Sequence, residues 1–484
     1  MPGYLLGFAL IAIVLTVTAL VSGLVERSPL SFPLIFLGLG FVLGERVFGV
    51  IEIGPHDPTL EIVATLTLAL VLFLDAVRLD VREPGEHWFV PYLILGPGTV
   101  LIIALGAIPI ALLLGFTWVM AFIGGAILAS TDPVVLREIL RDVRIPRSVR
   151  QILKIEAGTN DIVVLPVILV LIAVAQTKVD DTTGWIVFLA RLLLLGPIIG
   201  FSVGGVGSWL MARIDARMNI RLEYQSLYGI GLVLAAYTAA TAVGGDGFLA
   251  AFAAGLAVVV LDQKLCDCFL EYGEVTSEMA MLVAFVLFGV VLSGILDGIA
   301  MGPALLLAGL VIFIIRPSVL GLILSRARMS WEAHAFISWF GPRGLNSLLL
   351  ALLVVQAEVP GSELLLAAVG VVVLASVTVH GATATPISVW YGWKAARQTL
   401  VEERENTAAG LFSHDHGEGN SITPEELREL LTSSSPPTVL DVRSRSSYHH
   451  AGVRIPGSIC VVPDQVIEWA ANQPKDRTIV AYCS

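Results

Sequence analysis

Residues 155–175 read IEAGTNDIVVLPVILVLIAVA, and they place charged and polar residues directly before a long apolar run. The apolar part, Ile162 to Ala175, has 14 residues, whereas a helix needs about 20 to cross a bilayer. A spanning helix must therefore include the preceding turns, which brings Asn160 and Asp161 into the membrane core. An ionisable residue at that depth is costly and normally marks a transport pathway.

The composition of the whole chain agrees with a membrane protein. Of its 484 residues, 56% are hydrophobic and 14% are charged, whereas ordinary soluble proteins carry about 25% charged residues. The charges occur in short clusters between apolar runs and in the segment after Val401. This pattern excludes a soluble enzyme, a secreted disulfide scaffold and a disordered chain, and we expect neither a cofactor nor a nucleic-acid partner.

The apolar runs predict an all-α polytopic protein that spans the lipid bilayer of the cell (inner) membrane about thirteen times. The predicted spans are 4–25, 30–48, 59–77, 90–114, 117–136, 149–175, 184–211, 223–243, 245–261, 278–298, 302–324, 331–356 and 362–391. We interpret 4–25 as a spanning helix rather than a cleaved signal peptide, because no basic residue precedes it.

Basic residues gather in alternate loops of this arrangement. They are Arg78, Arg82, Arg137, Arg141, Arg144, Arg147, Arg150, Lys154, Arg213, Arg217, Arg221, Arg326, Arg328, Lys394 and Arg397. Because positive residues stay on the cytoplasmic side, we expect the N-terminus outside and the C-terminus in the cytoplasm.

Few charged residues fall at membrane depth. Asp132 stands between Thr131 and Pro133 in the fifth span, Glu156 and Asp161 lie in the sixth, and Arg343 lies in the twelfth. Carboxylate and amide oxygens on neighbouring helical turns can replace the water around a small alkali cation. The alternative is that Glu156 and Asp161 only occupy a cytoplasmic helix end. Four further charged residues lie nearer predicted helix ends or stand alone: Asp75, Arg191, Asp246 and Arg316.

The fifth and twelfth spans are predicted to be interrupted. Pro133 removes a backbone donor beside Asp132, and Gly341, Pro342 and Gly344 surround Arg343. If spans one to six and eight to thirteen form two inverted repeats, the two interruptions occupy equivalent positions. Crossed, interrupted helices in inverted repeats indicate a transporter binding site. Two ordinary proline kinks are the alternative.

These motifs resemble the cation:proton antiporter superfamily. Thr131-Asp132-Pro133, then Asn160-Asp161, then the segment around Arg343 follow in the order and spacing of its sodium/proton exchangers. The Asn-Asp pair is similar to that of the electroneutral branch, and the likeness extends over about residues 1–395. The chain departs from many relatives at Ala157, where they carry a serine.

The resemblance implies a role for each site residue. Asp161 would bind the cation and the proton alternately, Thr131 and Asp132 would line the site, and Asn160 would shape it. Glu156 would help to hold Arg343 and could approach the ion. A Na⁺ site would thus comprise Asp161, Thr131 and Glu156, with Arg343 as the compensating charge. The resemblance also implies a homodimer.

Competition at one carboxylate would account for exchange. Burial disfavours the charged form of Asp161, whereas a nearby cation favours it, so that a proton and a cation compete for the same group. The expected function is exchange of protons for monovalent cations, with Na⁺ as the expected ion and Li⁺ also transported, in pH and sodium homeostasis. K⁺/H⁺ exchange is the alternative within transport, and a membrane-tethered sulfurtransferase or rhodanese-based sensor is the alternative in another class.

The C-terminal residues predict a separate unit. We divide the chain into a transmembrane domain (1–398), a polar linker (399–420) and a small α/β segment (421–484). Its Asp-Val-Arg, Ile-Pro-Gly and Tyr-Cys motifs resemble an incomplete, truncated rhodanese domain, in which Cys483 would be a vestigial nucleophile. The loop that follows this cysteine in the family would stabilise a thiolate. The chain ends one residue after Cys483, and we therefore expect no sulfur transfer.

Overall fold

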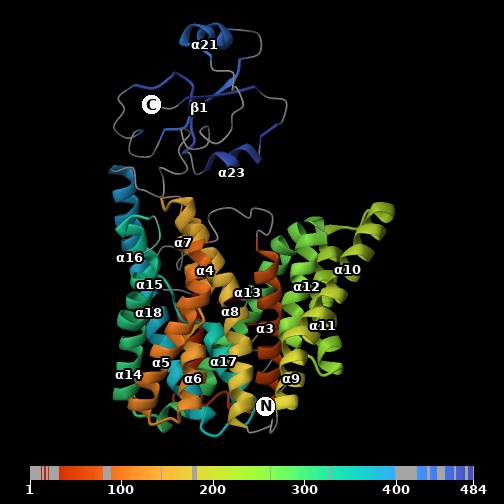
Figure 1. The fold of residues 1–484 in the computed structure, drawn as a ribbon, viewed down its shortest axis with the longest axis vertical. Helices are drawn as coiled ribbons and strands as arrows, with labels where there is room; N and C mark the ends of the chain where they lie inside the picture. Colours follow the sequence, from red (N-terminus) through yellow and green to blue (C-terminus); the bar gives the residue numbers. More distant parts are fainter. Residues whose placement is uncertain are drawn as a thin grey trace.

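The computed structural model in Figure 1 shows a helical transmembrane part and a small C-terminal segment with a sheet. It describes residues 32–79, 89–142, 144–176, 182–261, 263–325, 329–397, 422–432, 436–443, 453–462, 465–471 and 478–482, with some isolated positions. The predicted first span, 4–25, lies almost entirely outside these residues, as does the linker 399–420. Every other predicted span coincides with helix.

Helices account for almost all of the described transmembrane part. They are α2 (Phe32–Leu43), α3 (Pro58–Val77), α4 (Phe89–Leu93), η2 (Ile94–Gly98), α5 (Thr99–Leu114), α6 (Trp118–Ala129), α7 (Pro133–Arg141), α8 (Arg147–Ala175), α9 (Thr182–Ala190), η3 (Arg191–Leu195), α10 (Gly196–Met218), α11 (Leu222–Ala242), α12 (Gly247–Leu261), α13 (Gln263–Ile295), η4 (Leu296–Gly298), α14 (Met301–Leu310), η5 (Val311–Ile315), α15 (Arg316–Leu324), α16 (Trp331–Trp339), α17 (Leu345–Gln356) and α18 (Ser362–Arg397). Within the described residues, eight helical runs are long and apolar enough to cross a membrane. The prediction of an all-α, multi-pass membrane protein is confirmed.

The two predicted interruptions are present. The fifth span divides into α6 and α7 around residues 130–132, and the twelfth divides into α16 and α17 around residues 340–344. Pro133 opens α7, where its missing N–H costs no hydrogen bond.

Three short π-helical turns interrupt other spans beside prolines. Pro97 lies within η2, and Pro197 and Pro317 lie two residues after the ends of η3 and η5. A proline cannot donate to the preceding turn, and a wider π turn accommodates the missing bond. The turn at η5 ends immediately before Arg316, which is buried.

The helices form two groups. In the scaffold bundle, α13 packs on α2 and α3, and α12 packs on α3, α10 and α11. In the crossing bundle, α6 packs on α5 and α8, α7 packs on α8 and α18, α17 packs on α18, and α15 packs on α16. The bundles meet where α3 and α13 face α8, α17 and α18. In Figure 1, α10–α12 lie at one side of the molecule and α14–α16 at the other.

Glycines allow a close approach of two helices in the scaffold bundle. A Cβ built on Gly200 or Gly204 of α10 would overlap the backbone of α12, and one built on Gly196 would overlap the backbone of Asp246, directly before α12. The spacing of four residues puts these glycines on one face of α10, where small residues let membrane helices pack backbone to backbone.

The C-terminal segment contains a parallel sheet and two short helices, α21 (Pro424–Leu431) and α23 (Val466–Ala471). Strands β1 (Thr438–Asp441), β2 (Ile459–Cys460) and β3 (Ile479–Tyr482) pair in the order β2-β1-β3. Although burial disfavours its charged form, hydrogen bonds from Arg443 and Tyr482 hold the pKa of Asp441 below its usual range. The predicted α/β segment is confirmed, and Cys483 lies outside the described residues.

Substituting Gly200 tests the contact between α10 and α12. Gly200→Ala places a methyl group on the backbone of Ala250, and overpacking of this kind costs about 1–3 kcal/mol. We expect a lower thermal unfolding midpoint in detergent. Gly231→Ala in α11, where a Cβ meets nothing within 4 Å, is the control and should not lower the midpoint. Equal midpoints for the two variants would contradict the close approach.

Candidate functional site

The carboxylate of Asp132 joins the two interrupted helices. Its Oδ1 accepts from the backbone N–H of Val134 at 2.8 Å, which caps α7. Its Oδ2 accepts from the backbone N–H of Leu345 at 2.7 Å, at the start of α17. The backbone N–H of Asp132 donates in turn to the carbonyl of Pro342 at 3.0 Å. One buried side chain thus satisfies donors at both helix N-termini, where the helix dipoles favour a negative charge.

Gly344 permits this contact. A Cβ at this position would overlap the carboxylate of Asp132. Position 344 therefore requires glycine because the α16–α17 interruption approaches Asp132 closely, and not because the backbone turns there.

Asp161 accepts hydrogen bonds from both interruptions. Ser130 Oγ, at the end of α6, donates to Oδ1 at 2.5 Å, and Asn346 Nδ2, in the first turn of α17, donates to Oδ2 at 2.5 Å. The Asp161 side chain is buried. Both donors are neutral, and within the described part of the chain Asp161 has no ion-pair partner. The carboxylate is held in place without compensation of its charge.

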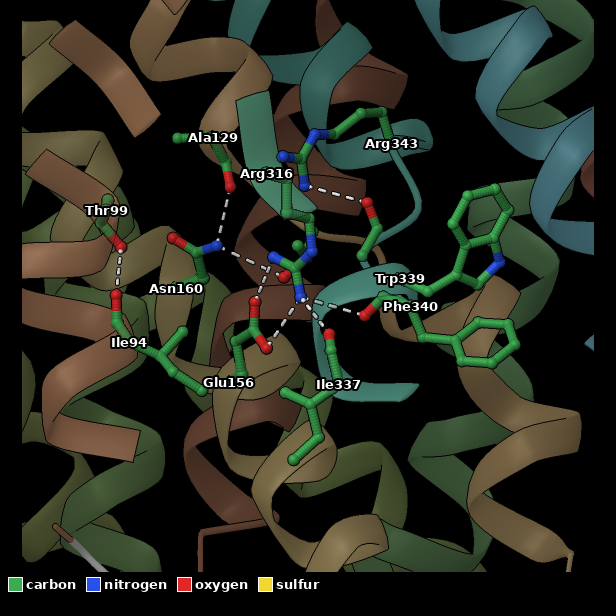
Figure 2. A network of polar contacts seen from close by, with 12 residues as sticks. Ile94, Thr99, Ala129, Glu156, Asn160, Arg316, Ile337, Trp339, Phe340 and Arg343 are labelled. Atoms are coloured by element: carbon green, nitrogen blue, oxygen red, sulfur yellow. Dashed lines mark hydrogen bonds and ion pairs between the residues drawn. The ribbon is translucent and has the colours of Figure 1, made fainter. Parts of the chain in front are cut away.

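Asn160 supports the interruption of the fifth span, as Figure 2 shows. Its Nδ2 donates to the carbonyl of Ala129 at 2.8 Å and to Thr131 Oγ1 at 3.3 Å. Its Oδ1 is buried and has no hydrogen-bond partner among the described residues. The residue directly before Asp161 in α8 therefore carries an unused amide oxygen.

The predicted pairing of Glu156 with Arg343 is wrong. Arg316, at the start of α15, donates to Glu156 through Nη1 to Oε1 at 2.6 Å and Nη2 to Oε2 at 3.1 Å (Figure 2). Both side chains are about 3% exposed, and Arg316 Nη2 also donates to the carbonyls of Ile337 and Phe340. The sequence predicts that Arg316 lies near a helix end. Its guanidinium is buried against the end of α16, where it binds carbonyls that the broken helix leaves unpaired.

Arg343 binds backbone rather than a carboxylate. Its Nη1 donates to the carbonyl of Gly341 at 3.1 Å, and its backbone N–H donates to Ser376 Oγ of α18 at 2.8 Å. No ion pair to Arg343 occurs among the described residues, although its side chain is buried. The guanidinium of Arg343 therefore lies inside the crossing bundle without direct contact with Asp132 or Glu156.

A cavity of about 570 Å³ leads towards this site between the two bundles. Its lining includes Pro133 and Gly158, which are close in sequence to Asp132 and Asp161. Asp75 of α3 also lines it and is 2% exposed; its Oδ2 has no hydrogen-bond partner among the described residues. Asp75 Oδ1 lies 3.7 Å from Arg78 Nη1, and the carboxylate is an acidic group on the wall of this cavity.

The sequence analysis missed four of these residues. Asp75 and Arg316 had been considered to lie near helix ends, yet both are buried. Ser130 precedes the Thr131-Asp132 motif directly, so its position beside the interruption could have indicated a role. Asn346 follows Arg343 within one turn, and only the crossing of the helices shows that it reaches Asp161. Many relatives carry a serine at the position of Ala157. In this chain Ser130 is the residue whose hydroxyl binds Asp161.

Comparison with known proteins agrees with this geometry. The family described as "Sodium/hydrogen exchanger, transmembrane" matches residues 12–390. The chain belongs to the sodium/hydrogen exchanger family. A second family, the rhodanese-like domain, matches residues 423–484 and includes the small sheet.

Relatives of this chain include two proteins named K(+)/H(+) antiporters. NhaP from Alkalimonas amylolytica is 29% identical over 364 residues, covering 74% of this chain and 62% of that protein. NhaP2 from Shewanella baltica is 26% identical over 386 residues, covering 78% of this chain and 66% of that protein. The matched region thus spans less than two thirds of the length of these relatives.

A solved structure shares the fold of this chain. The sodium proton antiporter MjNhaP1 from Methanocaldococcus jannaschii superposes with a TM-score of 0.69 at 18% identity, covering 80% of this chain and 99% of that one. The predicted resemblance to cation:proton antiporters, with a rhodanese-like segment at the C-terminal end, is confirmed.

A double-mutant cycle tests the ion pair between Glu156 and Arg316. Arg316→Gln leaves Glu156 as a buried charge without its partner, a change that costs about 3–5 kcal/mol. Adding Glu156→Gln removes that charge, so the double variant should unfold at a higher temperature than Arg316→Gln alone. Arg191→Gln, at the exposed arginine that begins η3, is the control. Additive losses in the double variant would contradict a direct pair.

Proposed function

We propose that this exchanger is a secondary active antiporter that exchanges protons for a monovalent cation at Asp161. The proposal is carried by one observation: Asp161 is a buried carboxylate whose described partners are the neutral Ser130 and Asn346. A buried charge without a counter-charge is unfavourable, and it is relieved when the carboxylate binds either a proton or a cation. The two ligands therefore exclude each other at one group.

The surrounding residues either coordinate the cation or maintain the crossing of the broken helices. The uncoordinated Oδ1 of Asn160, the hydroxyl of Ser130 and the hydroxyl of Thr131 are the oxygens that we propose as further cation ligands. Asp132 is committed to two helix N-termini, and we propose that it maintains the crossing. Both oxygens of Glu156 bind Arg316, so we propose that Glu156 acts through that ion pair and not as an ion ligand.

Asp75 extends the pathway towards the cavity. Its carboxylate lines the space between the bundles and has an unused oxygen. A carboxylate at this position attracts a cation towards Asp161. Asp75 is therefore proposed as an approach residue in the same pathway.

We propose sodium as the transported cation, with lithium as a close analogue, and potassium as the alternative. The curated relatives named above are K(+)/H(+) antiporters, which supports potassium. The structural neighbour is a sodium proton antiporter, which supports sodium. The donor oxygens in the site suit either ion, so the choice depends on measurement.

The membrane topology and the assembly are also proposals. The basic loops support an N-terminus outside the cell membrane and a C-terminus in the cytoplasm. The expected homodimer follows from the family resemblance. For the rhodanese-like segment, we keep the prediction that it does not act as a sulfurtransferase.

Replacement of Asp161 tests the exchange site. Asp161→Asn cannot bind a proton and a cation in turn, so cation-dependent proton movement in proteoliposomes should fall to background for sodium, lithium and potassium alike. A pH-sensitive dye inside the vesicles reports the movement. Exchange at the wild-type rate in this variant would show that another group carries the ions.

Asp246→Asn is the matched control for this substitution. Asp246 precedes α12 and accepts from the backbone N–H of Leu249 at 2.8 Å, a capping role that asparagine also fills. This variant should exchange ions like the wild-type chain. Separate assays with Na⁺, Li⁺ and K⁺ on the wild-type chain identify the cation, and a wild-type chain inactive with all three would contradict the proposed function.

A further inference from the structure

The cavity that leads to the candidate site has one wall in each bundle. Its lining from the scaffold bundle comes from α3 and α13, and its lining from the crossing bundle comes from α7 and α8. Any movement of one bundle against the other therefore changes the shape of this cavity.

Ion pairs connect the two walls near the charged end of the cavity. Arg137 of α7 donates through Nη1 to Glu278 Oε1 of α13 at 2.7 Å, and its Nη2 lies 3.7 Å from Glu274 Oε1. Glu274 also pairs with Arg78, at the end of α3, at 2.9 Å. Arg78 and Glu274 belong to the same bundle, whereas Arg137 reaches its partners from the opposite bundle.

Partial burial of these side chains strengthens the ion pairs of Arg137. Arg137 is 21% exposed, Glu278 is 27% exposed and Glu274 is 33% exposed. Pairs at this depth are screened less than fully exposed ones. A charge-assisted hydrogen bond at 2.7 Å also depends steeply on distance, so a shift of a few Å between the bundles would break it.

The attachment of α7 makes Arg137 sensitive to such a shift. The helix packs on α8 and α18 and begins directly after the interruption that contains Asp132. Movement of the crossing bundle therefore carries Arg137 with it, while α13 stays with α2 and α3.

We propose that Arg137, Glu274 and Glu278 form a latch between the bundles that stabilises the conformation in which this cavity is open. The latch breaks when the crossing bundle moves to expose Asp161 to the other side of the membrane. Its place in ion exchange rests on the proposed function, but its effect on the cavity does not.

A labelling experiment tests the latch without measuring transport. The four native cysteines are replaced by serine, and Gly158→Cys provides a thiol in the cavity lining, where a Cβ meets only ordinary contacts. The rate of its reaction with a water-soluble maleimide reports how often the cavity is open. Arg137→Gln should slow the labelling by up to about fivefold, the factor that corresponds to losing a partly buried ion pair of about 1 kcal/mol.

Arg141→Gln is the matched control. Arg141 lies one turn after Arg137 on α7 and lines the same cavity, but it is exposed. Its substitution removes the same charge and should leave the labelling rate unchanged. The reversed pair Arg137→Glu with Glu278→Arg should restore the rate, because it exchanges the partners without removing the contact.

Two results would overturn the latch. The first is equal labelling of the Arg137→Gln and Arg141→Gln variants. The second is slow labelling of the reversed pair in a chain that purifies as a folded protein. If Arg137→Gln does not fold, Glu278→Gln removes the principal contact from α13 and is subject to the same criteria. A wild-type chain without exchange activity would contradict the proposed function but would leave these labelling results valid.

Discussion

Backbone groups freed by two broken helices must find partners where no water is available. This constraint determines the arrangement of the crossing bundle. Asp132 satisfies donors of α7 and α17, Asn160 binds the carbonyl of Ala129, and Arg316 binds the carbonyls at the end of α16. Side chains that a sequence comparison would assign to ion binding are thus occupied in maintaining the breaks.

The contacts that maintain the helix breaks also determine which buried charges are compensated. Glu156 is neutralised by Arg316, and Asp132 faces two helix N-termini. Asp161 is left with neutral donors alone, one from each broken helix. Of these three carboxylates, Asp161 alone therefore has neither a cationic partner nor a helix N-terminus to balance its charge. This is the condition under which small ligands of opposite charge exchange at a single position.

Much of the fold could be predicted because it depends on local signals. Apolar runs of sufficient length identified the spans, and Pro133 and the Gly341-Pro342 pair identified the interruptions. Asp161 could be found because the run after it is too short to cross a membrane. Partners that come together only through the crossing could not be found in this way. Asn346 and Asp161 are 185 residues apart in the chain, and Glu156 and Arg316 are 160 apart.

The π turn at η5, in the eleventh predicted span, determines the direction in which Arg316 points. A π turn holds one residue more than the corresponding α turn, and each residue in a helix rotates the following side chains by about 100°. The same residues wound as a regular α-helix through Val311–Ile315 would keep their apolar length and their membrane topology. They would nevertheless turn Arg316 away from Glu156. A change of helix type that leaves hydropathy unchanged would thus remove the counter-charge from Glu156.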